Sequence, residues 1–99
     1  MRLEREGRIG AHHPALPGHF PGRPIVPGVV LLAELERIIE EACKAQVVEW
    51  PHVKFTSPLK PEQSFVMRLE DSDGELFRFS VVSGDSLIAT GSLRIAETL

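Results

Sequence analysis

The chain has 99 residues, which allow one domain with one modest hydrophobic core. A formal net charge of −3 and the lack of a basic run argue against a nucleic-acid-binding surface. The charged N-terminus is not expected to be a signal peptide, and no apolar run approaches the ~20 residues of a membrane-spanning helix. The only cysteine, Cys43, cannot form an intramolecular disulfide, which is consistent with a reducing compartment. We therefore expect a cytoplasmic protein of one domain, residues 1–99, that binds neither nucleic acid nor membrane.

A strand and a stiff loop are predicted before the first helix. Residues 2–11 alternate loosely between apolar and charged side chains and predict a strand. Residues 12–28 hold five of the eight prolines, so no regular element is expected there. This loop also carries apolar side chains, whereas linkers are usually polar or rich in glycine and serine. A long, rigid loop of this kind more often carries function than serves as a mere connection.

Residues 29–44 predict the one clear helix, because apolar residues from Leu31 to Ala42 repeat at i, i+4, i+7 and i+11. Its beginning, residues 29–33, is apolar on every side, and we expect that end to be buried all round. Its second half is rich in charged residues and is expected to meet solvent on one side.

Four strands are predicted after the helix, separated by turns. Pro51 lies inside the first of them and indicates an edge position or a bulge. A helix followed by an antiparallel meander is an α+β arrangement, in which the sheet wraps the helix. The predicted strands cover residues 47–56, 64–70, 76–82 and 87–96.

The loop carries a motif that resembles the signature of a known enzyme family. Gly18 to Val29 read GHFPGRPIVPGV and match the pattern G-H-F-P-G-x-P-x-x-P-G-V of the β-hydroxyacyl-acyl carrier protein dehydratases, which are FabZ/FabA-like. Residues 53–65, VKFTSPLKPEQSF, resemble the downstream strand-turn-strand of that family. The resemblance implies a hot-dog fold, an antiparallel sheet of about five strands wrapped round one central helix. It also implies a homodimer with a continuous sheet, whose sites are completed across the interface.

The implied reaction converts a 3-hydroxyacyl thioester, carried on acyl carrier protein or coenzyme A, into a trans-2-enoyl thioester. His19 suits the base that takes the C2 proton, because a histidine titrates near neutral pH. Gly28 and Val29 lie in the first turn of the helix, where backbone N–H groups lack intrahelical partners and can hold the thioester oxygen. Phe20 and Ala33 are expected to contact the substrate. No metal or redox cofactor is implied.

The helix departs from the family at the positions of its carboxylate and its glutamine, which are Ala33 and Arg37 here. Glu34 is the leading candidate for the acid, although one position along a helix turns a side chain by about 100°. The alternative is a solvated ion-pair stripe of Glu34, Arg37 and Glu41, spaced i, i+3 and i, i+4. His19 could also act as both base and acid, or a bound water could serve.

Two other functions compete with dehydration. A hot-dog thioesterase would need a carboxylate to activate water, and Glu34 is the only well-placed candidate. A non-catalytic acyl-binding or partner subunit is what Ala33 and Arg37 favour, whereas the intact histidine loop argues against it. A metal site built from His12, His13, His19 and His52 is not expected, because no cysteine or carboxylate sits at ligand spacing.

Overall fold

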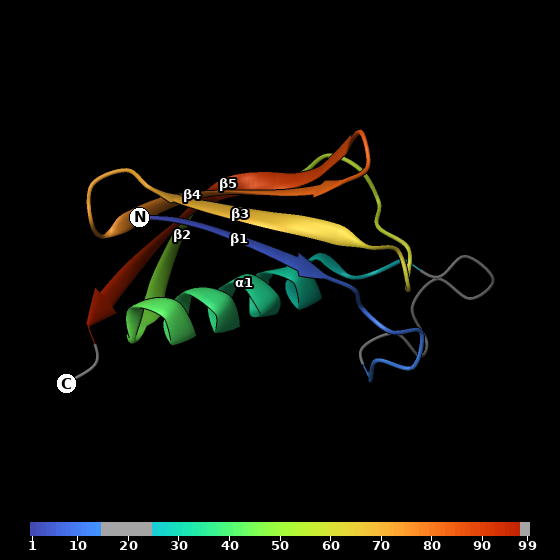
Figure 1. The fold of residues 1–99 in the computed structure, drawn as a ribbon, viewed down its shortest axis with the longest axis horizontal. Coiled ribbons are helices and arrows are strands. Elements are labelled where there is room, and N and C mark those ends of the chain that lie inside the picture. Colours follow the sequence, from blue (N-terminus) through green and yellow to red (C-terminus); the bar gives the residue numbers. More distant parts are fainter. Residues whose placement is uncertain (15–24, 98–99) are drawn as a thin grey trace.

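The computed structural model describes residues 1–14 and 25–97, which form one sheet curved around one helix (Figure 1). Neighbouring strands are antiparallel and follow the order β1-β3-β4-β5-β2. This arrangement confirms the predicted α+β architecture of five strands around one helix. The elements are β1 (Arg2–Gly7), α1 (Gly28–Cys43), β2 (Ala45–Phe55), β3 (Phe65–Asp71), β4 (Leu76–Ser83) and β5 (Ser86–Glu97).

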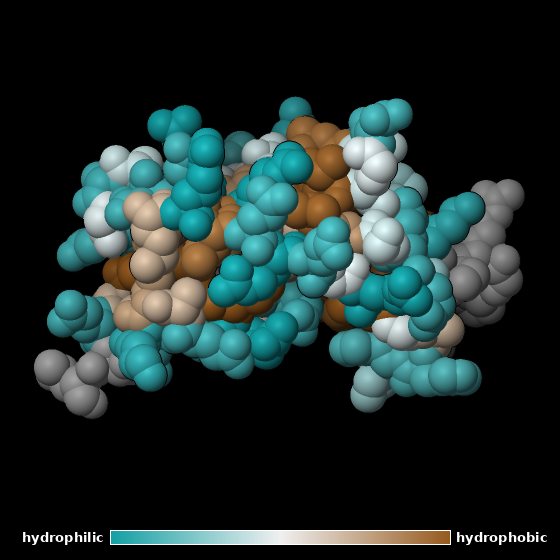
Figure 2. Space-filling model, viewed as in Figure 1, coloured by the Kyte–Doolittle hydropathy of each residue, from teal (hydrophilic) through white to brown (hydrophobic). Residues whose placement is uncertain are grey.

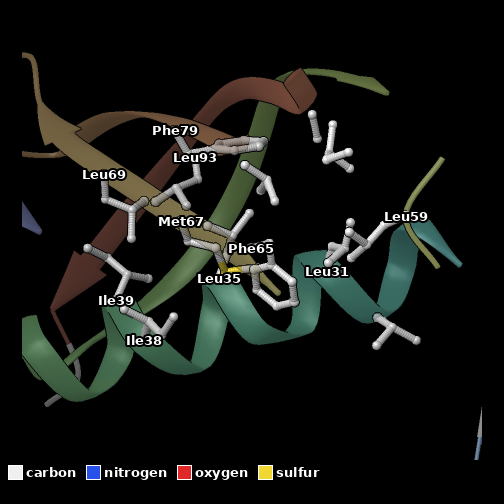
Figure 3. Packing of buried hydrophobic residues seen from close by; sticks show 14 of the residues in the cluster. Leu31, Leu35, Ile38, Ile39, Leu59, Phe65, Met67, Leu69, Phe79 and Leu93 are labelled. Carbon is white, nitrogen blue, oxygen red and sulfur yellow. The ribbon is translucent and has the colours of Figure 1, made fainter. Parts of the chain in front are cut away.

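The core lies between the concave face of the sheet and one side of α1. Leu35 and Ile39 are fully buried on the helix, and Figure 3 shows them pointing toward Met67 and Leu93 of the sheet. The helix ends at Lys44, which adopts a left-handed conformation at the C-cap. In the part of the chain that the structure describes, no helix is long and apolar enough to cross a membrane.

The prediction that the first turn of α1 is buried all round was wrong for the single chain. Val30 and Leu31 are buried, but Val29 is 71% exposed and Ala33 is also exposed. The sheet covers only one side of the helix, and the apolar pattern reveals which residues are hydrophobic, not which element covers them. Hydrophobic side chains also reach the surface on the face drawn in Figure 2, among otherwise hydrophilic ones.

Strand β2 is an irregular edge strand, as Pro51 predicts. Its pairing with β5 shifts register on both sides of Glu49. Opposite this irregularity lies Gly91, where an added Cβ would sit 2.1 Å from the His52 carbonyl oxygen and 2.9 Å from the Phe79 ring. Trp50 is partly buried and packs edge-to-face on Phe79, with ring centroids 5.8 Å apart. Only glycine fits where β2 crosses β5 this closely.

The turn between β2 and β3, residues 56–64, is fastened to the rest of the sheet by side-chain hydrogen bonds. The Thr56 hydroxyl donates to the Leu87 carbonyl oxygen at 2.6 Å. The buried Ser83 hydroxyl donates to the Ser64 carbonyl oxygen at 2.7 Å and accepts from the Gln63 amide at 2.8 Å. The turn is therefore a fixed part of the scaffold.

Candidate active site

An apolar pocket opens at the beginning of α1. Its volume is about 570 Å³, and its walls come from the segment before the helix, the end of β2 and the turn that follows β2. Leu31 and Leu59 close its inner side and belong to the hydrophobic core (Figure 3). A largely apolar pocket with a few polar groups is the usual form of a small-molecule site. The lining residues are Ile25, Val26, Pro27, Gly28, Leu31, Phe55, Thr56, Ser57, Pro58, Leu59 and Ile88.

At the start of α1, two backbone N–H groups have no acceptor among the described residues. The N-cap residue, Pro27, provides no side-chain hydrogen bond, and the first turn contains no acidic residue. The Val30 N–H donates to the Pro27 carbonyl oxygen at 3.0 Å. Within residues 1–14 and 25–97, the N–H groups of Gly28 and Val29 have no acceptor. As far as the described residues go, the positive end of the helix dipole is therefore open to an oxygen that carries partial negative charge.

Of these two residues, only Gly28 lines the pocket. Its α-carbon lies against the ring of Phe55, so an added Cβ would come within 2.4 Å of the ring tip. Phe55 ends β2 and is 48% exposed, so its ring forms a half-exposed wall beside the glycine. No pattern in the sequence singled out Phe55 as a residue of the site. The only signal for it was the aromatic strand in the segment that resembles the family.

The predicted base, His19, and its neighbour Phe20 lie outside the described residues. His19 and Phe20 fall within positions 15–24, so their places in the site remain predictions. The described end of this segment at Val26 is buried, and its N–H donates to the Leu59 carbonyl oxygen at 2.8 Å. The chain therefore enters α1 along the wall of the pocket.

The structure places Glu34 away from the pocket that Gly28 lines. Glu34 lines a smaller groove of about 230 Å³ between α1 and β1. Its carboxylate lies 3.0 Å from Arg37, and Arg37 lies 3.3 Å from Glu41, which confirms the predicted ion-pair stripe. The hydrogen bond to Glu34 and the two negative charges raise the pKa of Arg37. Ala33 is exposed and lines neither space, so one chain does not bring Ala33 or Glu34 to Gly28.

The other candidate side chains stand apart from this site. In the described part of the chain, no group of three or more histidine, cysteine or acidic residues is placed to hold a metal ion. Cys43, at the far end of α1, is partly buried, and its sulfur lies 3.7 Å from the Met1 sulfur. Burial raises the pKa of its thiol.

This chain is similar to known proteins both in sequence and in fold. The family model of the ApeI-like dehydratases matches residues 2–92. The 3-hydroxyacyl-acyl-carrier-protein dehydratase FabZ of Anaeromyxobacter sp. (strain Fw109-5) is 33% identical over 87 residues. That match covers 88% of this chain but 49% of the relative, so the chain spans about half the length of this curated relative.

Two solved structures have the same fold. The dehydratase heterocomplex ApeI:P from Xenorhabdus doucetiae superposes with a TM-score of 0.85 at 20% identity, covering 97% of this chain and 88% of that one. The fluoroacetyl-CoA thioesterase FlK superposes with a TM-score of 0.69 at 14% identity, covering 97% and 84%. The fold alone therefore does not choose between dehydration and hydrolysis. The family model covers most of the chain, and this protein accordingly belongs to the ApeI-like family of FabZ/FabA-like dehydratases with the hot-dog fold.

Proposed function

We propose that this chain dehydrates a 3-hydroxyacyl thioester, carried on an acyl carrier protein or on coenzyme A, to a trans-2-enoyl thioester. The observation that carries the proposal is the open N–H of Gly28 in an apolar pocket at the start of α1. As the C2 proton leaves, negative charge grows on the thioester oxygen. Backbone N–H donors at a helix start stabilise such charge without reorganisation. The N–H of Val29 is the second donor in this proposal.

The proton balance of the reaction needs no separate acid. His19 takes the proton from C2, the C2–C3 double bond forms, and the C3–O bond breaks. The imidazolium then returns the same proton to the departing hydroxyl, which leaves as water. We favour this route over Glu34 as the acid, because Glu34 is held by Arg37 in the groove beside β1. Phe20 and Ala33 remain proposed contacts of the acyl group.

The lining of the pocket weakens the thioesterase alternative for a single chain. Hydrolysis would need a carboxylate that activates water at the thioester, and the pocket that Gly28 lines has no carboxylate among the described residues of one chain. The remaining alternative is a non-catalytic partner subunit, which shares the pocket but lacks turnover.

We further propose that the chain works in an assembly with a second hot-dog subunit, either an identical copy or a related chain. The free edge of β2 can accept another strand, and Val48 and Phe55 on this strand are 57% and 48% exposed. On α1, Val29 is 71% exposed. A second subunit would cover this apolar surface. The related ApeI:P structure is itself described as a heterocomplex.

The proposed function predicts a specific mass change in the substrate. The purified protein, with its assembly state measured by light scattering, is incubated with a 3-hydroxyacyl carrier-protein thioester, and the acyl group is followed by mass spectrometry. We expect a loss of about 18 mass units, one water, with the thioester intact. Release of free acid would instead establish a thioesterase. An unchanged acyl group would leave the partner-subunit role and overturn the enzymatic proposal.

Substitution of Gly28 tests the proposed oxygen site. In Gly28→Ala the added methyl group occupies the space beside the donor N–H, so we expect kcat to fall by about a hundredfold. Thermal stability should change little, because the half-exposed ring of Phe55 can swing aside. The companion variant Phe55→Leu removes the ring and adds no methyl group to the glycine. It should alter KM for the acyl group and leave kcat within about threefold. Equal loss of kcat in both variants would show that the ring, and not access to the amide, controls turnover.

A further inference from the structure

The chain is attached to the same turn before and after the histidine segment, residues 15–24. Before the segment, the Glu62 N–H donates to the Ile9 carbonyl oxygen at 2.8 Å. After it, the Val26 N–H donates to the Leu59 carbonyl oxygen at 2.8 Å. In Figure 1 the yellow-green connection between β2 and β3 descends to the side of the molecule where β1 ends and α1 starts. This turn therefore holds the chain on both sides of the segment.

The side chain of Glu62 also contacts the chain between β1 and the histidine segment. Its Oε1 accepts the N–H of Ala11 at 2.8 Å, and its Oε2 lies 3.8 Å from the guanidinium of Arg8. One glutamate thus bonds the chain through its backbone at Ile9 and through its side chain at Ala11. A carboxylate that accepts a backbone N–H makes a charge-assisted bond, which is stronger than a neutral one.

The backbone of Glu62 is held in an unfavourable conformation. Its φ is 69°, in the left-handed region that glycine and asparagine usually occupy. The other left-handed positions among the described residues are Lys44, which ends α1, and two glycines in hairpin turns. Strained positions persist where the surroundings enforce them, and an observed outlier justifies a hypothesis about function. From this position the Glu62 carboxylate contacts Ala11 and Arg8, which precede the histidine segment.

The turn that carries Glu62 is itself rigid. Leu59 is 1% exposed and belongs to the core. The Gln63 side chain accepts the Lys60 N–H at 3.0 Å and donates to the Ser83 hydroxyl at 2.8 Å, which links the turn to the end of β4. The backbone bonds that Leu59 and Glu62 make to Val26 and Ile9 are therefore anchored to the core and to β4.

We propose that Glu62 is a positioning residue of this protein, which clamps the chain at Ile9 and Ala11, ahead of the segment that carries the proposed base His19. The expected effect on turnover rests on the proposed dehydratase function. The attachments that Glu62 makes to Ile9 and Ala11 do not depend on that function. A base displaced by a fraction of an ångström from its substrate loses much of its rate. Loosening the clamp should therefore lower kcat and leave substrate binding nearly unchanged.

Four proteins test the clamp: wild type, Glu62→Ala, Glu62→Gln and the control Glu70→Ala. Glutamine keeps an oxygen that can accept the Ala11 N–H, and alanine retains the strained backbone but loses the acceptor. Glu70 is a comparably exposed glutamate, paired with Arg2 on the outer face of the sheet. Solvent exchange of the Ala11 amide, measured by NMR, should be roughly fivefold faster in Glu62→Ala and near wild type in the other two variants.

Turnover of the assembled protein is the second measurement. We expect kcat to fall by about tenfold in Glu62→Ala with KM unchanged, and to recover in Glu62→Gln. Faster Ala11 exchange with an unchanged kcat would overturn the positioning role, as would equal losses in the alanine and glutamine variants. If the wild type proves inactive, the proposed function fails. The NMR resonances of the His19 ring then test whether Glu62 acts as a clamp. Those resonances should shift or broaden in Glu62→Ala alone, and an unchanged spectrum would reject the clamp.

Discussion

Replacing His19 with alanine is expected to lower kcat by about a thousandfold, with little change in the thermal unfolding temperature. A positioned general base contributes ~10²–10⁴ to rate, and in the proposed route one imidazole both removes the C2 proton and delivers it to the leaving hydroxyl. Loss of the ring removes both transfers at once. The measurement is the rate of enoyl formation from a 3-hydroxyacyl thioester at saturating substrate.

The matched control is His12→Ala, which removes an exposed imidazole from the same region of the chain. It should retain nearly the full wild-type rate. Glu34→Gln provides a second comparison, because it removes the charge that pairs with Arg37 and keeps the shape of the side chain. We expect it to retain at least about a third of the wild-type kcat. A loss in Glu34→Gln as large as that in His19→Ala would restore Glu34 as the acid and contradict the single-residue route.

Gly91→Ala is expected to cause the largest loss of stability of any glycine substitution in the described chain. The added Cβ would lie 2.1 Å from the backbone oxygen of His52 and 2.9 Å from the Phe79 ring. A side-chain tip could move, but a carbonyl oxygen moves only with its strand. We expect the free energy of unfolding to fall by about 3 kcal/mol or more, which is a large part of the 5–15 kcal/mol typical of a domain.

Urea unfolding of Gly91→Ala and of the neighbouring control Ser92→Ala measures this effect. Ser92 lies beside Gly91 on β5, and its hydroxyl forms no hydrogen bond within the described residues. The control should therefore stay within about 0.5 kcal/mol of wild type. Similar unfolding midpoints for the two variants would mean that β2 yields easily at its bulge.

Most of the fold could be predicted because periodic patterns fix local structure. The helix predicted over residues 29–44 runs from Gly28 to Cys43, and Pro51 correctly indicated an edge strand with a bulge. The predicted start of β2, at residue 47, was late. Ala45 and Gln46 lack a strand pattern and extend only because they pair with the end of β5.

The candidate site was harder to predict because it depends on contacts between distant segments. The motif pointed to Gly28, and the structure places Gly28 in an apolar pocket. Phe55 covers that glycine from another strand, and Glu62 reaches back to Ala11 from a turn, so neither contact leaves a local pattern. The apolar periodicity of the helix likewise could not show that the sheet leaves Val29 uncovered.

The shared attachment of the chain before and after the histidine segment separates that segment from the sheet. Ile9 and Val26 are both bonded to the turn between β2 and β3, so substitutions between them need not alter the sheet. Selection could therefore retune the side chains of this stretch for new acyl groups, while the sheet around the helix stays as it is.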